Sequence, residues 1–416
     1  MTAPATTRGF YGWRITWALA ATQTLGYGIL FYTFSVFLQP MELELGWTRA
    51  QASGAFSAAL LLSGLVAAPV GRWVDARGGR LVMSVGSAAG VLLLLAWSFV
   101  TTLPALYLVQ AGIGVVMGMV LYDVAFTVLA TWFRRHRIRA MIIVTLLAGL
   151  ASTIFIPLAT ALQEGFGWRV ALRLLALLMA LTAVPLHALV LRDRPSRLGL
   201  EPDGGSPQTT RLAPETSVGT KEALRTQAFW WLSLACSLDR IAIVGIAAHS
   251  VVLLLERGYS PALVASVAGT IGLMQVGGRL LFSPASSRAS LVHLAVLTYA
   301  IRVAALLALL LVHGPIGLWT FAVLFGIANG ASTLARAGLI AAVFGPAHYG
   351  SISGSMTLFI AVAQTLAPLA IGLMRDRTGT YDWALVVLAV LAAVAAAAVS
   401  RVRLPESATE PRPAAA

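Results

Sequence analysis

The sequence has little charge. Asp, Glu, Lys and Arg make up 11% of its 416 residues, whereas soluble domains carry about 25%. The mean hydropathy is +0.84. This scarcity excludes an ordinary water-soluble enzyme and indicates a chain that is mostly embedded in a bilayer.

Cysteine and known catalytic motifs are also scarce. Cys236 is the sole cysteine, so neither an intramolecular disulfide nor a cysteine metal cluster can form. The sequence contains no Walker-type Gly-x-x-x-x-Gly-Lys loop, no His-Glu-x-x-His and no Gly-x-Ser-x-Gly. We therefore expect no cofactor, no metal and no enzymatic activity. An intramembrane enzyme and a sensor without flux are the alternatives from other classes.

Long hydrophobic runs, in contrast, are abundant. A helix needs about 20 apolar residues to cross the bilayer core. Apolar runs between charged or Pro/Gly breaks predict twelve such helices, at 12–39, 49–71, 80–100, 104–132, 138–163, 168–191, 227–255, 260–284, 290–312, 315–343, 350–374 and 381–402.

The polar segments divide these spans into two sets of six. The longest polar stretch, 192–226, is rich in Pro, Gly, Ser and Thr and predicts a cytoplasmic linker. We expect six-helix bundles at 12–191 and 227–402. A cytoplasmic N-terminus at 1–11 and a disordered cytoplasmic tail at 403–416 complete the chain. The predicted fold class is an all-α integral membrane protein with two pseudo-symmetric bundles.

The distribution of basic residues predicts the orientation. The formal net charge is +13. With a cytoplasmic N-terminus, 19 of the 29 cations fall in inside segments, 5 in outside segments and 5 within apolar runs. This bias predicts that both termini are cytoplasmic. It also explains most of the charge by topology and contact with lipid, rather than by nucleic-acid binding.

A common register relates the two halves. Glu44, Gly46 and Trp47 recur as Glu256, Gly258 and Tyr259, at a spacing of 212. The same spacing places Gly114-x-x-x-Gly118 over Gly326-x-x-x-Gly330. A shared offset at two separate places indicates a duplicated six-helix unit. Such duplication is typical of transporters and argues against an intramembrane enzyme.

The segment between the second and third predicted helices carries a motif. It reads Gly71-Arg-Trp-Val-Asp75-Ala-Arg77-Gly78-Gly79-Arg80. This resembles the loop signature of the major facilitator superfamily. The glycines permit a tight turn, and Asp75 can face a helix N-terminus. The resemblance implies a secondary transporter with rocking halves.

Three further segments resemble the monocarboxylate and oxalate transporter branch of that superfamily: GFYGW (9–13), WFRRHRIRA (132–140) and GYSP (258–261). Arg8 stands where that branch has an acid at the start of the first motif. The drug–proton antiporter signature, of the Gly-x-x-x-Gly-Pro type, is missing from LLAGLASTIFIPLATAL (146–162). Drug efflux by proton antiport is therefore a less favoured alternative.

Arg279 lies deep in the predicted eighth helix. Charges at such depth are costly and mark functional sites. The resemblance implies that Arg279 binds the substrate carboxylate and that Gln275 assists it. The two residues are four apart and share a helix face, and a planar guanidinium can bind a carboxylate through two hydrogen bonds. The alternative is an arginine that snorkels to the cytoplasmic surface.

The seventh helix holds His249 and Glu256, seven residues apart and on one face. The resemblance implies substrate binding for His249 and proton coupling for Glu256. A structural histidine, and a Glu256 at the helix end that pairs with Arg257, are the alternatives. Asp239 is a further candidate for coupling or gating, and a structural ion pair is expected for Arg240.

Four more candidates come from other helices. Asp123 and Arg336 are deep in the fourth and tenth helices, and the resemblance implies that they face each other across a cavity. Arg336 is a second candidate for binding the anion and Asp123 for accepting a proton; two fixed, locally satisfied charges are the alternative. Tyr27 and Tyr122 are candidate cavity residues. Two arginines are expected to be peripheral, Arg173 and Arg302.

The deep charges predict the sign of the substrate. Arg240, Arg279, Arg302 and Arg336 outnumber Asp123 and Asp239 by two. We predict a transporter of a small organic anion, a monocarboxylate by resemblance, with proton coupling or exchange. We expect a monomer. A single lysine, Lys221, with abundant Ala and Arg suggests a GC-rich bacterial genome and hence an inner-membrane location.

Overall fold

The computed structural model describes residues 10–47, 49–204, 217–286 and 288–404. These ranges are almost entirely helical and contain no strand. The chain divides into two compact units, one of Met1–Thr216 with Tyr349–Ser351 and one of Ser217–His348 with Ile352–Ala416. The expected N-terminal segment up to residue 9, the middle of the linker (205–216) and the tail from 405 lie outside the described residues.

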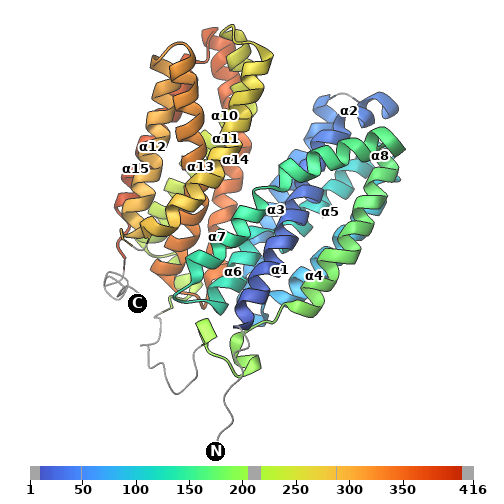
Figure 1. The fold of residues 1–416 in the computed structure, drawn as a ribbon, viewed down its shortest axis with the longest axis vertical. Helices are drawn as coiled ribbons and strands as arrows, with labels where there is room; N and C mark the ends of the chain where they lie inside the picture. Colours follow the sequence, from blue (N-terminus) through green and yellow to red (C-terminus); the bar gives the residue numbers. More distant parts are fainter. Residues whose placement is uncertain (1–9, 48, 205–216, 287, 405–416) are drawn as a thin grey trace, which may run out of the picture. The chain divides into compact units, whose positions relative to one another are not determined.

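The first unit contains the six predicted spans of the first half (Figure 1). Its helices are α1 (Tyr11–Gly26), a π-helix (Tyr27–Tyr32), α2 (Thr33–Leu45), α3 (Arg49–Arg77), α4 (Gly79–Trp97), α5 (Leu103–Val120), α6 (Tyr122–Trp132), α7 (Arg137–Ala148), α8 (Ala151–Pro185) and a second π-helix (Leu186–Val190). Gly167, with φ of +77°, bends α8 between the fifth and sixth predicted spans.

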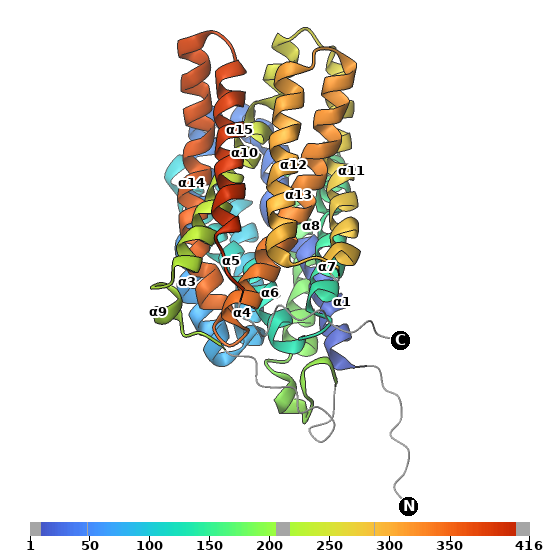
Figure 2. The same cartoon turned by 90° about the vertical axis from the view of Figure 1, so that its left-hand side faces the viewer.

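The second unit contains the other six spans. A short α9 (Thr220–Ala223) precedes α10 (Gln227–Glu256), α11 (Pro261–Ser286), α12 (Leu291–Leu311), α13 (Pro315–Phe344), α14 (Tyr349–Thr378) and α15 (Asp382–Ser400). In this unit α13 lies against both α11 and α12, and α10 lies against α15 (Figure 2).

The predicted spans are confirmed as helical membrane segments. In the described ranges, nine helical stretches are long and apolar enough to cross a membrane, and one of them, Arg137–Val190, holds two predicted spans. The helices from α1 to α2, together with α11, account for the remaining two. The described ranges therefore belong to an all-α membrane protein, and their helices are consistent with the twelve predicted spans.

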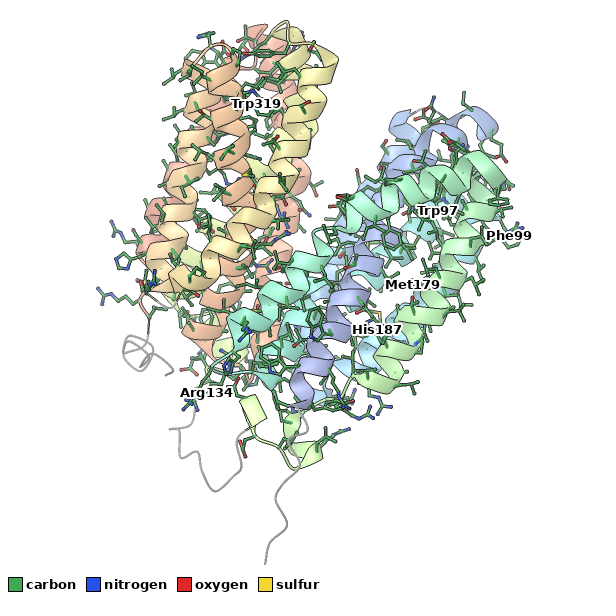
Figure 3. The ribbon with its side chains drawn as sticks, viewed as in Figure 1. Trp97, Phe99, Arg134, Met179, His187 and Trp319 are labelled. Atoms are coloured by element: carbon green, nitrogen blue, oxygen red, sulfur yellow. The ribbon has the colours of Figure 1, made fainter. Side chains whose placement is uncertain are left out.

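Large apolar side chains lie on both the inside and the outside of each unit. Figure 3 shows Trp97 and Met179 inside the first unit, where they are 0% and 1% exposed, and Phe99 on its outside, where it is 67% exposed. Ile316 and Trp383 are similarly exposed on the second unit. Exposed apolar surface on this scale is unfavourable in water and suits contact with lipid.

The duplicated packing predicted from the glycine spacing is present in the structure. A Cβ on Gly114 of α5 would collide with the carbonyl oxygen of Ala59 in α3, and a Cβ on Gly326 of α13 would lie 2.6 Å from that of Ile271 in α11. Ala59 and Ile271 are themselves 212 residues apart. The same helix contact therefore occurs once in each unit, at the same offset.

The first and the fourth predicted helices of the first unit both depart from regular helix. The predicted helix 12–39 contains the π-helix Tyr27–Tyr32. The predicted helix 104–132 is broken at Leu121, whose φ of −85° and ψ of −166° are extended. The structure therefore adds a break within the predicted fourth span, which is otherwise a single membrane-length stretch, Leu103–Trp132. Gln23 of α1 supports the break, because its Nε2 donates a 2.6 Å hydrogen bond to the carbonyl of Val120.

The first part of the predicted linker is built into the first unit. Asp203 accepts hydrogen bonds from the backbone N–H groups of Arg134, Arg135 and His136, just before α7. Arg194 donates to the carbonyls of Asp75 and Ala76 at the end of α3. Residues 192–204 therefore pack against the first unit where α3 ends and α7 begins.

Candidate functional site

The loop signature forms a tight turn. Gly78 joins α3 to α4 with a φ of +87°, a conformation that favours glycine. A Cβ at this position would also collide with Asp193. The guanidinium of Arg77 lies 4.3 Å from the Trp73 ring, and Arg80 donates to the carbonyl of Ala188.

Asp75 faces a helix N-terminus, as expected from the sequence. Its two carboxylate oxygens accept hydrogen bonds of 2.8 and 2.7 Å from the N–H groups of Gly350 and Ser351, which belong to the first unit and to the first turn of α14. These N–H groups have no partner within their own helix. Gly71 allows the close approach, since a Cβ there would meet the Gly350 carbonyl.

The first unit brings together three of the predicted site residues beside the helix break. Tyr27 begins the π-helix, and Tyr122 and Asp123 form the first turn of α6. The Tyr27 and Tyr122 rings lie 4.6 Å apart. A helix N-terminus favours an acidic side chain nearby, and Asp123 lies in the first turn of α6. Irregular backbone at membrane depth is characteristic of transporter binding sites.

The second unit contains a buried ion pair that the sequence did not predict. Arg302 of α12 is 0% exposed, and its Nε donates a 2.5 Å hydrogen bond to Asp239 of α10. Its Nη1 donates to Asn329 of α13, and its guanidinium lies 5.0 Å from the Phe325 ring. The expectation that Arg302 is peripheral was wrong. Asp239 lies in this pair, and its suggested coupling role stays a prediction.

Arg279 differs from Arg302 in its surroundings. It is only 6% exposed, so it does not snorkel to a surface. Its Nε and Nη1 are buried and have no hydrogen-bond partner among the described residues. Gln275 lies one turn earlier on the same helix. A buried cation with unused donors is costly, and an anionic ligand would remove that cost.

Arg336 of α13 has hydroxyl partners on α14. Its Nη2 donates to the Thr357 hydroxyl at 2.5 Å and reaches the Ser353 hydroxyl at 3.3 Å. Asp123 belongs to the other unit, so the suggested pairing of Asp123 with Arg336 stays a prediction.

His249 of α10 joins two other segments. Its Nε2 lies 3.0 Å from the Pro368 carbonyl of α14, and its Nδ1 lies 3.3 Å from the Tyr381 hydroxyl. Because a carbonyl can only accept, the contact with Pro368 is a hydrogen bond that Nε2 donates. These contacts fit the structural alternative for His249 and leave its suggested role in substrate binding a prediction.

Glu256 lies at the end of α10 and pairs with Arg375 at 3.0 Å. The suggested pairing with Arg257 was wrong, because Arg257 binds Asp382 at 2.7 Å. The repeat-related Glu44 also lies at a helix end, where it accepts from Trp168 and Arg169. Glu256 therefore occupies a helix-end position, and its suggested coupling role stays a prediction.

Three polar residues escaped the sequence analysis: Gln23, Asn329 and Tyr381. Gln23 is the most informative, since an amide in an apolar helix that is 0% exposed requires a buried partner. The sequence alone already showed a glutamine within an apolar run. Within the described part of the chain, no cluster of three or more His, Cys, Asp or Glu could hold a metal ion.

Comparisons with known proteins agree with this architecture. The family model described as Major Facilitator Superfamily matches residues 17–322. Human monocarboxylate transporter 11 is 26% identical over 404 residues, covering 90% of this chain and 79% of that protein. Its mouse counterpart is 33% identical over 210 residues, covering 49% of this chain and 44% of that protein.

Solved structures show the same fold at low identity. The E. coli fucose:proton symporter superposes with a TM-score of 0.69 at 14% identity, covering 95% of this chain and 98% of that one. A second structure of that transporter, in the outward conformation, gives a TM-score of 0.68 at 13% identity, covering 93% of this chain and 98% of that one. At these identities the match concerns the fold alone.

Proposed function

Because the chain belongs to the Major Facilitator Superfamily, we propose that this multi-pass membrane transporter carries a small organic anion, with monocarboxylates as the preferred class. Transport is secondary and alternates access between the two sides of the membrane, driven by a proton gradient or by exchange. We also propose a bacterial inner-membrane location, from the single lysine and the abundant Ala and Arg. In this proposal both termini are cytoplasmic, from the distribution of the basic residues.

The observation that carries this proposal is that Arg279 is buried with unused hydrogen-bond donors. Arg302 forms an ion pair with Asp239 and donates a hydrogen bond to Asn329, whereas Nε and Nη1 of Arg279 are buried without partners in the described residues. A carboxylate can accept two parallel hydrogen bonds from a guanidinium. Gln275, one turn away, would add a neutral hydrogen bond. The similarity to monocarboxylate transporter 11 supports the choice of a carboxylate.

The remaining candidates have supporting roles in the proposal. Arg336, His249, Tyr27 and Tyr122 contribute to substrate binding. Asp123 is the preferred proton acceptor, because a carboxylate in the first turn of α6 belongs to an irregular backbone segment. Asp239 and Glu256 are weaker coupling candidates, since each forms an ion pair with an arginine.

Uptake into proteoliposomes tests the proposal. Arg279→Ala should abolish uptake of labelled monocarboxylates while the purified protein keeps a monodisperse elution profile. Arg173→Ala is the matched control, because Arg173 is exposed and binds the Ser98 hydroxyl in the first unit. Unchanged uptake by the Arg279 variant would remove the assignment of this site.

Efflux of apolar drugs by proton antiport is the second candidate. The exposed and buried aromatic side chains of the first unit favour it only weakly, because lipid contact and core packing explain them. Stabilisation of the purified transporter by an apolar cation, with no stabilisation by any carboxylate, would favour this alternative.

A further inference from the structure

The turn of α11 that carries Gln275 and Arg279 is covered by a glycine of α13. In an α-helix the N–H of Arg279 bonds the carbonyl of Gln275. A Cβ on Gly330 would collide with that carbonyl oxygen and would lie 3.1 Å from the Arg279 nitrogen. Gly330 therefore lies directly against the backbone hydrogen bond that joins the two residues.

This contact is part of a longer approach of two backbones. Gly326 lies one turn before Gly330, and its Cβ would be 2.6 Å from the Ile271 carbonyl. Gly278 makes the reciprocal contact, because its Cβ would collide with the carbonyl of Ile327 in α13. Small residues at such a contact allow the backbones of two membrane helices to approach closely, and they thereby determine the distance between the helices.

Few polar contacts fix the position of the Arg279 guanidinium. Its Nε and Nη1 have no hydrogen-bond partner in the described residues, unlike those of Arg302. Its position therefore depends on the backbone of α11 and on apolar packing. Two-point recognition of a carboxylate is sensitive to the position and orientation of the guanidinium.

The first unit provides an internal reference for this contact. Gly118 of α5 is the counterpart of Gly330, and its Cβ would lie 3.1 Å from the carbonyl of Ser63 in α3. The residue at the position of Arg279 is Ala67, also at an offset of 212. The same packing thus exists where no substrate arginine is present.

We propose that Gly330 is a positioning residue for the substrate. Because Gly330 lets α13 pack closely against the Gln275–Arg279 turn, it determines the orientation in which Arg279 binds the carboxylate. This proposal rests on the proposed function of Arg279. It assigns to the α11–α13 contact a role in substrate affinity, in addition to the stabilising role that it shares with the α3–α5 contact.

Two matched pairs of variants test the proposal. Gly330→Ala is compared with Gly118→Ala, and Gly326→Ala with Gly114→Ala. Each change places a Cβ against a facing helix, so all four should lower the Tm of the purified protein. Only the second-unit variants should weaken substrate binding.

The expected readout is the KM for carboxylate uptake together with the maximal rate. A displacement of about 1 Å at a reacting or recognising group can cost up to roughly 100-fold, so Gly330→Ala should raise KM roughly 10- to 100-fold. Gly326→Ala should raise KM less. The maximal rate at saturating substrate should be retained, because binding is what the displaced turn impairs.

The outcomes separate the two proposals. Equal KM values for Gly330→Ala and Gly118→Ala, with similar losses of Tm, would show that Gly330 has a structural role only. If Gly330→Ala does not fold, the comparison of Gly326→Ala with Gly114→Ala decides in the same way. Unchanged KM in Arg279→Ala would overturn the proposed function instead. Loss of uptake in Arg279→Ala with a normal KM in Gly330→Ala would overturn only the positioning role.

Discussion

The two units share a helix packing but differ in what they bury. Asp239, Arg302 and Asn329 of the second unit correspond, at the offset of 212, to Tyr27, Gly90 and Met117 of the first. Around Gly90 the first unit is apolar, since a Cβ there would meet the Met179 side chain at 3.0 Å. At the positions of Asp239 and Arg302 the first unit therefore has no ion pair.

The regularity of the backbone also differs between the units, and here the special feature belongs to the first unit. The first unit has a π-helix at Tyr27–Tyr32 and a break at Leu121, whereas the corresponding residues of the second unit lie within the helices α10 and α13. At these corresponding positions the first unit combines irregular backbone with aromatic side chains, and the second combines regular helix with the buried Asp239–Arg302 pair. In the function proposed above, the anion-binding charge lies in the second unit, where Nε and Nη1 of Arg279 have no hydrogen-bond partner among the described residues.

The largest effect should come from breaking the ion pair that only the second unit has. Arg302→Met leaves Asp239 buried without its partner, and the loss of one member of such a pair costs about 3–5 kcal/mol. The double variant Asp239→Asn/Arg302→Met should recover most of that loss. Unfolding in mixed micelles measures both variants. A single variant as stable as the wild type would contradict the assigned role of the pair.

A smaller effect should come from the irregular backbone that only the first unit has. Gln23→Leu removes the donor to the Val120 carbonyl, and an unsatisfied buried acceptor costs about 1–3 kcal/mol. Thr24→Val is the control, because Thr24 donates only within its own helix, to Ala20. Equal stabilities of the two variants would show that the break does not depend on Gln23.

The predicted architecture and the missed details depend on different kinds of interaction. Bilayer thickness determines the length of each apolar run, so the spans and the repeat could be predicted from composition and spacing. The break at Leu121 depends on Gln23, 97 residues from Val120, and the burial of Arg302 depends on Asp239, 63 residues away. No pattern among residues that are close together in the sequence predicts such long-range pairings. Arg279 was identified from its depth and from the family resemblance, and its unused donors became apparent only in the structure.

The smallest effect concerns the repeat-related glutamates at the helix ends. Partial burial raises the pKa of Glu44, but the hydrogen bonds from Trp168 and Arg169 together lower it by more, so its net pKa lies below the usual value. A lowered pKa adds stability above the pKa of the unfolded state, and that stability is lost as pH falls through the folded pKa.

Glu44→Gln should therefore lower Tm at pH 7, and the difference from wild type should fade as pH falls below about 4. Glu256→Gln is the matched variant and should cost less, because Arg375 is the one hydrogen-bond donor to Glu256 among the described residues, and exposed pairs contribute little. Thermal unfolding across pH measures both. A Tm difference for Glu44→Gln that persists unchanged at low pH would contradict the ionic origin of the effect.

Equilibrium binding to the purified transporter tests the central claim most directly. A monocarboxylate and its uncharged amide are compared for their effect on Tm, with wild type and Arg279→Ala. We predict that the carboxylate raises the Tm of the wild type, that the amide does not, and that neither stabilises the variant. Equal stabilisation of wild type and Arg279→Ala by the carboxylate would contradict the account.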